Sequence, residues 1–321
     1  MKKPSFKGIW SLLKNSGSEF IENNSFRLAG ALAYVTIFSL PPLLIVMINF
    51  AGAIWGEEAV TGRLFQQIRS VVGDDAAAEI QTMIANFNQH DAGAMAAVIG
   101  IGTLIFASTT FFATLQESLN AIWNIRVKPE SSIMYMIKVR ATSFGLILSL
   151  GLLMLISFVL SAALLILTDY LQSILPGVAL IFIYIFNLLL NLFVISMLFA
   201  LVYRFLPDAH IRWKDTLVGA FVTALLFILG KYGIGLYIGN SDINSAYGAA
   251  GSLIVILVWI YWSSLILFYG AEFTQEYAEM YGHGVKPKKH AVRFALTEVH
   301  EPRPHVEGAG RPPADGRFRK K

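Results

Sequence analysis

Lys231 is a cation within an otherwise apolar segment, and cations at such positions are candidates for binding anionic groups. It lies about seven residues, or roughly 10 Å of helix, before the end of residues 216–238. A lysine at this depth costs a few kcal/mol unless it is paired or hydrated. Its long side chain could instead reach the membrane interface and serve no binding role. Glu117, the one acid inside a predicted span, lies at a different depth, so we expect no direct ion pair.

A second polar group is spaced i, i+3, i+7 along one predicted helix face and consists of Tyr184, Asn187 and Asn191. Both asparagines fall near the middle of the apolar run 178–203. Their amides could hydrogen-bond to a neighbouring helix, at about 1 kcal/mol each. Alternatively, they could line a polar cavity. The residues leave both alternatives open.

Pro41 and Pro42 interrupt the uncharged segment that follows Arg27. Two prolines remove two backbone donors, so the helix should kink or break near mid-membrane. The kink could be a packing feature, or it could mark a discontinuous helix beside a transport site. Tyr34 and Ser39 lie where they could supply polar contacts. With these residues, the candidate substrate path is Tyr34, Ser39, Pro41, Pro42, Tyr184, Asn187, Asn191 and Lys231, around a cavity between the first, fourth and fifth spans.

A third set of polar residues falls at the predicted cytoplasmic ends of the spans. They could form an ion-pair ring that closes that side, or they could anchor the helices at the lipid headgroups. These cytoplasmic gate candidates are Arg27, Glu117, Asn120, Arg140, Arg204 and Glu272.

The residue patterns argue against an enzyme. The chain has no cysteine, which excludes thiol catalysis, disulfides and cysteine-ligated metal. Its histidines form no HxxxH or HExxH pair, and no clustered carboxylates indicate a two-metal nuclease. Phosphate-loop and serine-hydrolase motifs are also missing. We therefore expect no catalytic residue, no metal site and no cofactor.

Six apolar runs must position these residues. The chain is 55% hydrophobic and 14% charged, whereas soluble domains carry about 25% charged residues. This composition predicts an all-α polytopic membrane protein. The predicted spans are 27–54, 94–122, 141–168, 178–203, 216–238 and 251–271. Residues 1–27 should form an amphipathic helix, either on the membrane surface or packed under the bundle. Residues 55–93 should form an amphipathic helical hairpin on the outer face.

The distribution of Lys and Arg predicts the topology. Segments 1–27, 125–140, 204–215 and 272–321 hold five, four, three and ten, whereas the loop 55–93 holds two. The loops 169–177 and 239–250 hold none. Both termini should therefore be cytoplasmic, in a multi-pass protein. The expected domains are 1–27, the transmembrane domain 28–281 and a disordered basic tail, 282–321. The cations lie between apolar runs, so we expect contact with anionic lipid rather than specific nucleic-acid binding.

Four stretches of the chain resemble the YihY/virulence-factor BrkB family of bacterial inner-membrane proteins, formerly labelled ribonuclease BN. They are AGALAYVTIFSLPPLLIV, LQESLNAIWNIR, YRFLPDAHIRWKDTLVGAFVTALLFILGKYGIGLYIG and SAYGAAGSLIVILVWIYWSSLILFYGAEFTQEYA. The resemblance covers most of residues 25–280. It implies a six-helix inner-membrane protein linked to envelope integrity, serum resistance and, in some members, lipid or lipopolysaccharide movement.

The leading hypothesis is that the protein transports or flips a lipid or an amphipathic envelope component, with Lys231 attracting an anionic headgroup. The alternative is a non-transporting scaffold for envelope integrity, and a homo-oligomer is compatible with either. A membrane-associated ribonuclease is a disfavoured third reading, because no residue pattern supports it. No internal repeat is visible, so alternating access by inverted halves is not supported.

Overall fold

In the part of the chain that it describes, the computed structural model is mostly helical, as the composition predicts, and has four short strands. The residues it describes are 6–55, 81, 94–128, 141–142, 145–146, 149, 152–153, 176–239 and 251–294. Its helices are α1 (Phe6–Glu22), α2 (Ser25–Trp55), α5 (Ala94–Ile122), α7 (Pro176–Phe205), α8 (Trp213–Gly239) and α10 (Gly251–Tyr281). Its strands are β1 (Ile125–Val127), β2 (Ala209–His210), β3 (Lys286–Pro287) and β4 (Ala291–Arg293).

Three stretches in the described residues are long and apolar enough to cross a membrane. They are Leu188–Phe205 in α7, Trp213–Tyr237 in α8 and Leu253–Tyr281 in α10. Five of the predicted spans coincide with α2, α5, α7, α8 and α10. The predicted third span, 141–168, and the outer hairpin, 55–93, lie largely outside the described residues. The count of six spans and the orientation of the termini therefore stay predictions.

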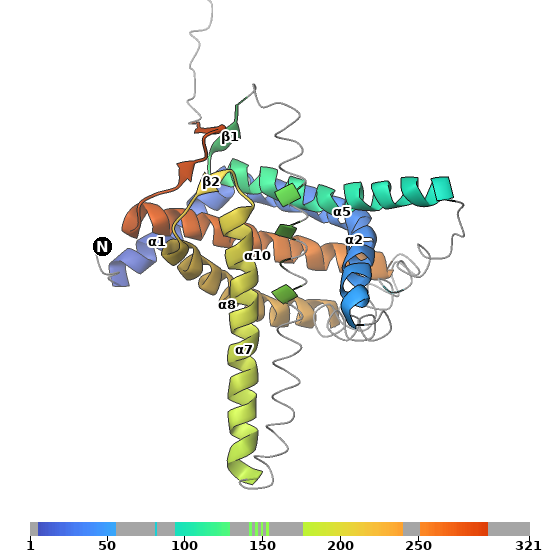
Figure 1. The fold of residues 1–321 in the computed structure, drawn as a ribbon. Coiled ribbons are helices and arrows are strands. Elements are labelled where there is room, and N and C mark those ends of the chain that lie inside the picture. Colours follow the sequence, from blue (N-terminus) through green and yellow to red (C-terminus); the bar gives the residue numbers. More distant parts are fainter. Residues whose placement is uncertain are drawn as a thin grey trace, which may run out of the picture.

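α2 remains helical through Pro41 and Pro42. Figure 1 shows that the helix nevertheless changes direction along its length, first following α5 and then turning away from it. Consecutive prolines remove two backbone hydrogen bonds and crowd the preceding turn, which bends a helix without ending it. The predicted kink is present, and the predicted complete break is not.

Hydroxyl side chains in the apolar helices bond to their own backbone. Thr36 Oγ1 donates to the Leu32 carbonyl at 2.6 Å, and Ser39 Oγ donates to Val35 at 2.6 Å. Thr223 and Thr274 make the same bond to Gly219 and Gly270. A hydroxyl that donates to the carbonyl four residues earlier in its own helix is not left without a partner when it is buried. These polar residues are therefore tolerated in apolar helices.

α10 is the central helix of the described fold. It packs against α1, α2, α5 and α8, while α2 also packs on α5 and α7 on α8. Close approach of α8 and α10 depends on glycines: a Cβ at Gly219 would collide with Thr274, and one at Gly270 would collide with Thr223 and Tyr203. The tightest core lies at the end of the molecule where α5 and α7 finish, and its fully buried side chains include Trp123, Tyr203, Phe268, Leu115 and Leu119.

α10 continues to Tyr281, ten residues past the predicted end of the sixth span. This extension contacts α1, because Asn15 Nδ2 donates to Glu276, and just before it the Tyr269 OH donates to the Leu13 carbonyl. Leu12 and Phe20 of α1 are buried, whereas Trp10 remains 68% exposed. α1 is therefore docked on the bundle through one face, and its contact with a membrane stays a prediction.

The basic tail is ordered at its start, which corrects the expectation of disorder from residue 282. β3 pairs antiparallel with β2, and β4 pairs antiparallel with β1. Gly284 supplies the positive φ of 68° that the turn after α10 requires. Composition suggested disorder, but the strand partners lie more than 70 residues earlier in the chain, where composition cannot reveal them. Residues 295–321 lie outside the described residues.

Figure 1 shows how the helices are arranged around this junction. α5 and α10 run alongside one another, whereas α7 leaves the region of β2 in a different direction. α7 and α8 are joined by the short connection that contains β2, and beyond their contact they run in different directions. That divergence positions the residues described next.

Candidate functional site

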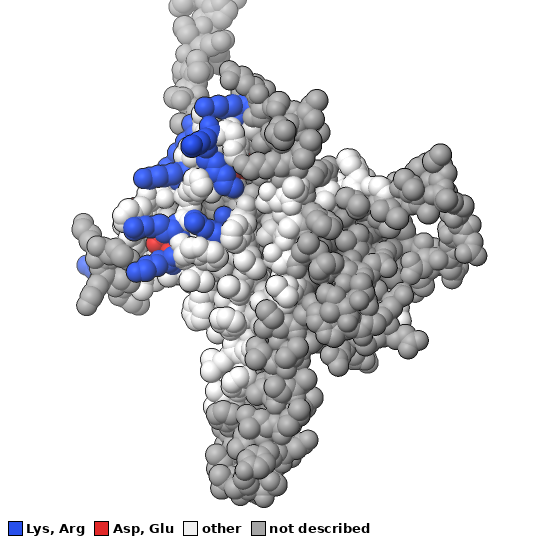
Figure 2. Space-filling view, viewed as in Figure 1, with Lys and Arg blue, Asp and Glu red and all other residues white. Residues whose placement is uncertain are grey.

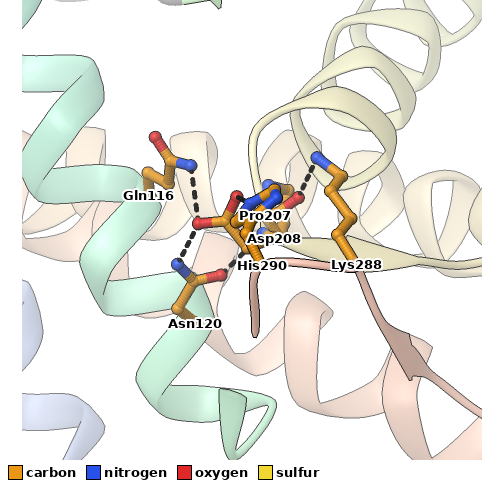
Figure 3. A network of polar contacts seen from close by, with 6 residues as sticks. All are labelled: Gln116, Asn120, Pro207, Asp208, Lys288 and His290. Carbon is orange, nitrogen blue, oxygen red and sulfur yellow. Dashed lines mark hydrogen bonds and ion pairs between the residues drawn. The ribbon is translucent and has the colours of Figure 1, made fainter. Parts of the chain in front are cut away.

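Asp208 lies in the connection between α7 and α8 and is 3% exposed. Its Oδ2 accepts hydrogen bonds from Gln116 Nε2 at 3.0 Å and Asn120 Nδ2 at 2.9 Å, both on α5. Its Oδ1 is 2.7 Å from His290 Nε2, and its backbone N–H donates to Asn120 Oδ1 at 2.8 Å. An ionised carboxylate only accepts, so in this pair the proton is on His290 Nε2. Figure 3 shows all three side chains converging on one carboxylate.

The segment after α10 holds the same connection through a second residue. Lys288 Nζ donates to the Pro207 carbonyl at 2.6 Å, and the Lys288 backbone N–H donates to the Asp208 carbonyl at 2.9 Å. The C-terminal segment thus binds the α7–α8 connection through both backbone and side chains. We call Gln116, Asn120, Asp208, Lys288 and His290 the junction network.

A second buried carboxylate, Glu272 on α10, bonds to Asn23 in the turn between α1 and α2. It is 1% exposed, and its Oε1 accepts from Asn23 Nδ2 at 2.8 Å. The same Asn23 amide lies 3.3 Å from the Ile122 carbonyl at the end of α5. Trp123 Nε1 donates to the Ala271 carbonyl at 3.1 Å. The ends of α1, α5 and α10 are therefore fastened together beside the junction network.

These two polar clusters hold the ends of several helices in fixed positions. Each carboxylate is occupied by amide or imidazole donors from other elements, so helix ends from distant parts of the chain are held in one arrangement. Among the described residues, no group of three His, Asp or Glu side chains could hold a metal ion. The consequence is a rigid end from which the helices extend.

The structure describes five of the six gate candidates and places them in different surroundings. Asn120 belongs to the junction network and Glu272 bonds to Asn23. The Arg204 guanidinium lies 5.5 Å from the Trp213 ring centroid, while Arg27 and Glu117 are exposed. Arg140 lies outside the described residues. Two ion pairs at this end join described residues, His290–Asp208 and Arg293–Glu279, and neither includes a gate candidate.

Next to the rigid end, α7 and α8 pack closely. The Tyr203 OH donates to the Leu267 carbonyl at 2.7 Å and lies 3.1 Å from Thr223 Oγ1. One step further along, Phe199 on α7 meets Phe227 on α8 edge to face, with ring centroids 5.8 Å apart. Phe227 also meets Trp259 of α10 at 5.7 Å.

Beyond this aromatic contact the two helices present polar groups that are not buried. Asn191 is on the same stripe of α7 as Ile195 and Leu198, which pack against the core. Asn191 itself is exposed, because α7 has by then moved away from the core. Lys231 follows Phe227 by one turn on the core-facing stripe of α8 and is partly exposed. We call these outward parts, α7 before Phe199 and α8 after Phe227, the α7–α8 wedge.

The remaining substrate-path candidates are placed differently. Tyr34 is 65% exposed and stacks edge to face on Phe38, and Ser39 is buried. Both are on α2, which packs on α5 and α10, whereas α7 packs on α8. The side chains of Pro41, Pro42, Tyr184 and Asn187 lie outside what the structure describes. The structure therefore puts Asn191 and Lys231 on the same wedge and groups Tyr34 and Ser39 with α5 and α10.

Sequence reasoning missed the residues of the junction network other than Asn120. Asp208 lies in a connection whose sequence stands out only for its cations, and His290 lies in a segment that composition predicts to be disordered. One signal was available: Asp208 directly follows Pro207 at the end of an apolar run, where an acid must find donors if the connection is buried.

These helices, their apolar spans and the buried polar clusters at one end define an α-helical integral membrane protein. A family model described as virulence factor BrkB matches residues 17–295, so the chain belongs to that family.

Curated relatives agree with this assignment. The chain is 31% identical over 266 residues to a UPF0761 membrane protein of Cronobacter sakazakii, covering 79% of this chain and 83% of the relative. It is 30% identical over 254 residues to one from Pseudoalteromonas translucida, covering 77% and 79%. It is 28% identical over 298 residues to one from Saccharophagus degradans, covering 92% of this chain but 66% of that relative. No solved structure matches the chain.

Proposed function

We propose that this protein moves a lipid or an amphipathic envelope component across the bacterial inner membrane along the α7–α8 wedge. One observation carries the proposal: Asn191 and Lys231 lie on the core-facing stripes of adjacent helices, yet both are accessible beyond the Phe199–Phe227 contact.

An amide and an ammonium group are costly in hydrocarbon when they lack a partner. A lipid headgroup that enters the wedge would offset this cost by accepting hydrogen bonds from Asn191 and by pairing with Lys231. An anionic phosphate fits best, because Lys231 is a cation. The acyl chains would stay in the bilayer beside exposed apolar residues such as Leu189 on α7 and Leu236 on α8. Only the polar headgroup then needs a path through the protein.

The rigid end supports this mechanism. The junction network and the Glu272 contacts hold the ends of α5, α7 and α10 and the start of α8, and past their contact α7 and α8 run in different directions. The Lys and Arg distribution predicts that the fixed end is cytoplasmic. On that topology the wedge opens toward the outer leaflet, in a multi-pass inner-membrane protein. The mechanism includes no covalent step, no cofactor and no metal.

The test is lipid translocation in liposomes that contain the purified protein. A fluorescent anionic lipid with an external quencher reports movement between leaflets. We expect Asn191→Leu and Lys231→Ala to slow translocation at least several-fold. Matched controls are Phe193→Leu and Leu229→Ala, which change exposed residues two positions away on other faces of the same helices. The controls should translocate like the unmodified protein. Equal rates in all five proteins would contradict the wedge as the path.

The rival is a non-transporting scaffold for envelope integrity. The observation in its favour is the C-terminal segment, which folds onto two helix connections and presents an ordered surface at the predicted cytoplasmic side. Absence of translocation above empty liposomes, with both anionic and zwitterionic lipids, would favour the scaffold.

A further inference from the structure

Three connections that are distant in the sequence form one basic surface. They are residues 125–128, 204–215 and 282–294, which hold two, three and four Lys and Arg residues. Strand pairing of β1 with β4 and of β2 with β3 brings them together. Figure 2 shows the resulting concentration of Lys and Arg side chains over these strands and the start of α8.

The acids of these connections do not reach this surface. Segments 125–128 and 282–294 contain none, and 204–215 contains Asp208 and Asp215. Asp208 is 3% exposed and Asp215 is 2% exposed. Both carboxylates are therefore withdrawn into the protein, while Arg126, Lys214 and Lys286 are exposed. The charge that the three connections present to the outside is positive.

This positive charge contributes to the lowered pKa of a neighbouring histidine. His210 in β2 has a pKa lowered first by partial burial and then by Lys288, Arg204 and His290. The charges that act on it come from the α7–α8 connection and from the C-terminal segment. The two segments thus contribute to one electrostatic field.

An exposed aromatic group adjoins the basic surface. Phe205, the last residue of α7, packs edge to face on Trp213, the first residue of α8, at 5.8 Å. Both are exposed, and Arg204 lies over the Trp213 ring. Leu217, Phe221 and Leu225 continue the exposed apolar stripe along α8. Tryptophan at the end of such a stripe is typical of the membrane interface, so the cations beside it lie among the headgroups.

We propose that this basic surface binds the phosphates of anionic phospholipids in the leaflet that contacts it, through Lys214, Lys286 and Lys289. A membrane is favoured over a nucleic acid because the cations adjoin exposed aromatic and aliphatic side chains of a membrane-spanning helix. The surface is separate from the α7–α8 wedge, and the proposal holds whether or not the protein moves lipid.

The experiment measures thermal unfolding of the full chain in detergent with added phosphatidylglycerol or phosphatidylcholine. Phosphatidylglycerol should raise the unfolding temperature of the unmodified protein more than phosphatidylcholine does, because binding to the folded state stabilises it. Added salt should reduce this difference. The variant Lys214→Ala/Lys286→Ala/Lys289→Ala should lose more than half of the difference. The charge-conserving variant Lys214→Arg/Lys286→Arg/Lys289→Arg should retain it.

The unfolding temperature in phosphatidylcholine alone shows whether the alanine variant is folded. If that temperature falls, the single variant Lys289→Ala replaces it and should lose part of the phosphatidylglycerol effect. An undiminished effect in the alanine variants would overturn the proposal. Equal stabilisation by both lipids, or stronger stabilisation by a single-stranded oligonucleotide than by phosphatidylglycerol, would overturn it as well.

Discussion

His290 Nε2 lies 2.7 Å from Asp208 Oδ1, which joins the segment after the last helix to the connection between α7 and α8. The two residues are 82 positions apart, and the carboxylate is almost completely buried. His290 bonds to Oδ1 of this carboxylate, whereas the two amides of α5 bond to Oδ2. The ordered end of the protein therefore depends on a pair of residues that neither composition nor hydropathy marks.

Asp208→Asn should destabilise the protein strongly. The change leaves the shape intact, but it removes the charge that His290 pairs with and places an amide where two amide donors converge. Breaking one side of a buried pair typically costs about 3 kcal/mol. Chemical unfolding in detergent would measure the loss. Glu117→Gln is the matched control, because Glu117 is an exposed acid on α5 next to Gln116 and should change stability by less than about 0.5 kcal/mol. Equal effects of the two variants would contradict the network's structural role.

Gly270→Ala should weaken the contact between α8 and α10. A Cβ at this position would collide with the Thr223 and Tyr203 hydroxyls, and inserting a methyl group into a tight contact costs about 1–3 kcal/mol. Gly235→Ala is the comparison, because its Cβ would meet nothing within 4 Å. Unfolding temperature should fall for the first variant and hold or rise for the second. If both unfolding temperatures fall equally, the loss of stability comes from replacing a glycine in a helix and not from the contact between α8 and α10.

The absence of cysteine makes disulfide crosslinking a clean test of the C-terminal segment. Val127 on β1 faces Ala291 on β4 in the antiparallel register. Directly opposite residues in an antiparallel pair have Cα atoms about 4.5–5.5 Å apart, which is within the range that a disulfide spans. Val127→Cys/Ala291→Cys should therefore crosslink on mild oxidation, as seen by a mobility shift. Val127→Cys/Val292→Cys should not, because Val292 points to the other face. Crosslinking of the second pair alone would show a different register.

Docking of α1 on α10 should depend on pH through Glu19. Its pKa is raised from 4.5 first by burial and then by Glu22 and Glu279, with Arg293 acting in the opposite direction. A raised pKa means that the folded state holds the proton more tightly than the unfolded state. This stabilisation is complete below pH 4.5 and is lost as pH rises through the folded-state pKa. Glu19→Gln should therefore raise the unfolding temperature at pH 7, with little difference at pH 4. A variant that is less stable at pH 7 would contradict this assignment.

The long uncharged runs made the main helices predictable. Residues 94–122 become α5 with the predicted bounds, because polar segments flank a predominantly apolar stretch whose one charge, Glu117, lies near its end. The strands after α10 could not be predicted in the same way. Lys286 and Ala291 lie in a polar, glycine-containing segment that is stabilised by partners in other connections, and such long-range pairing leaves no local pattern.

The candidate site was predictable only by residue type. Asn191 and Lys231 stand out because they are polar within apolar helices. Their common position beyond Phe199 and Phe227 depends on which faces of α7 and α8 meet and on where the helices diverge. Ser39, chosen on the same grounds, is buried and bonded to its own helix. The sequence alone does not tell which polar residue becomes exposed and which becomes buried, because both depend on the packing of neighbouring helices.

The central claim, that the wedge gives headgroups and water access to Asn191 and Lys231, is tested most directly by cysteine labelling in proteoliposomes. Four single variants in the cysteine-free chain are compared: Asn191→Cys, Lys231→Cys, Phe193→Cys and Leu229→Cys. A charged thiol reagent reacts with thiolates, which form in water and not in hydrocarbon. The account predicts fast labelling at 191 and 231 and slow labelling at 193 and 229, which are exposed on other faces and should contact lipid. Equal labelling at all four positions, or slower labelling at 191 and 231, would contradict it.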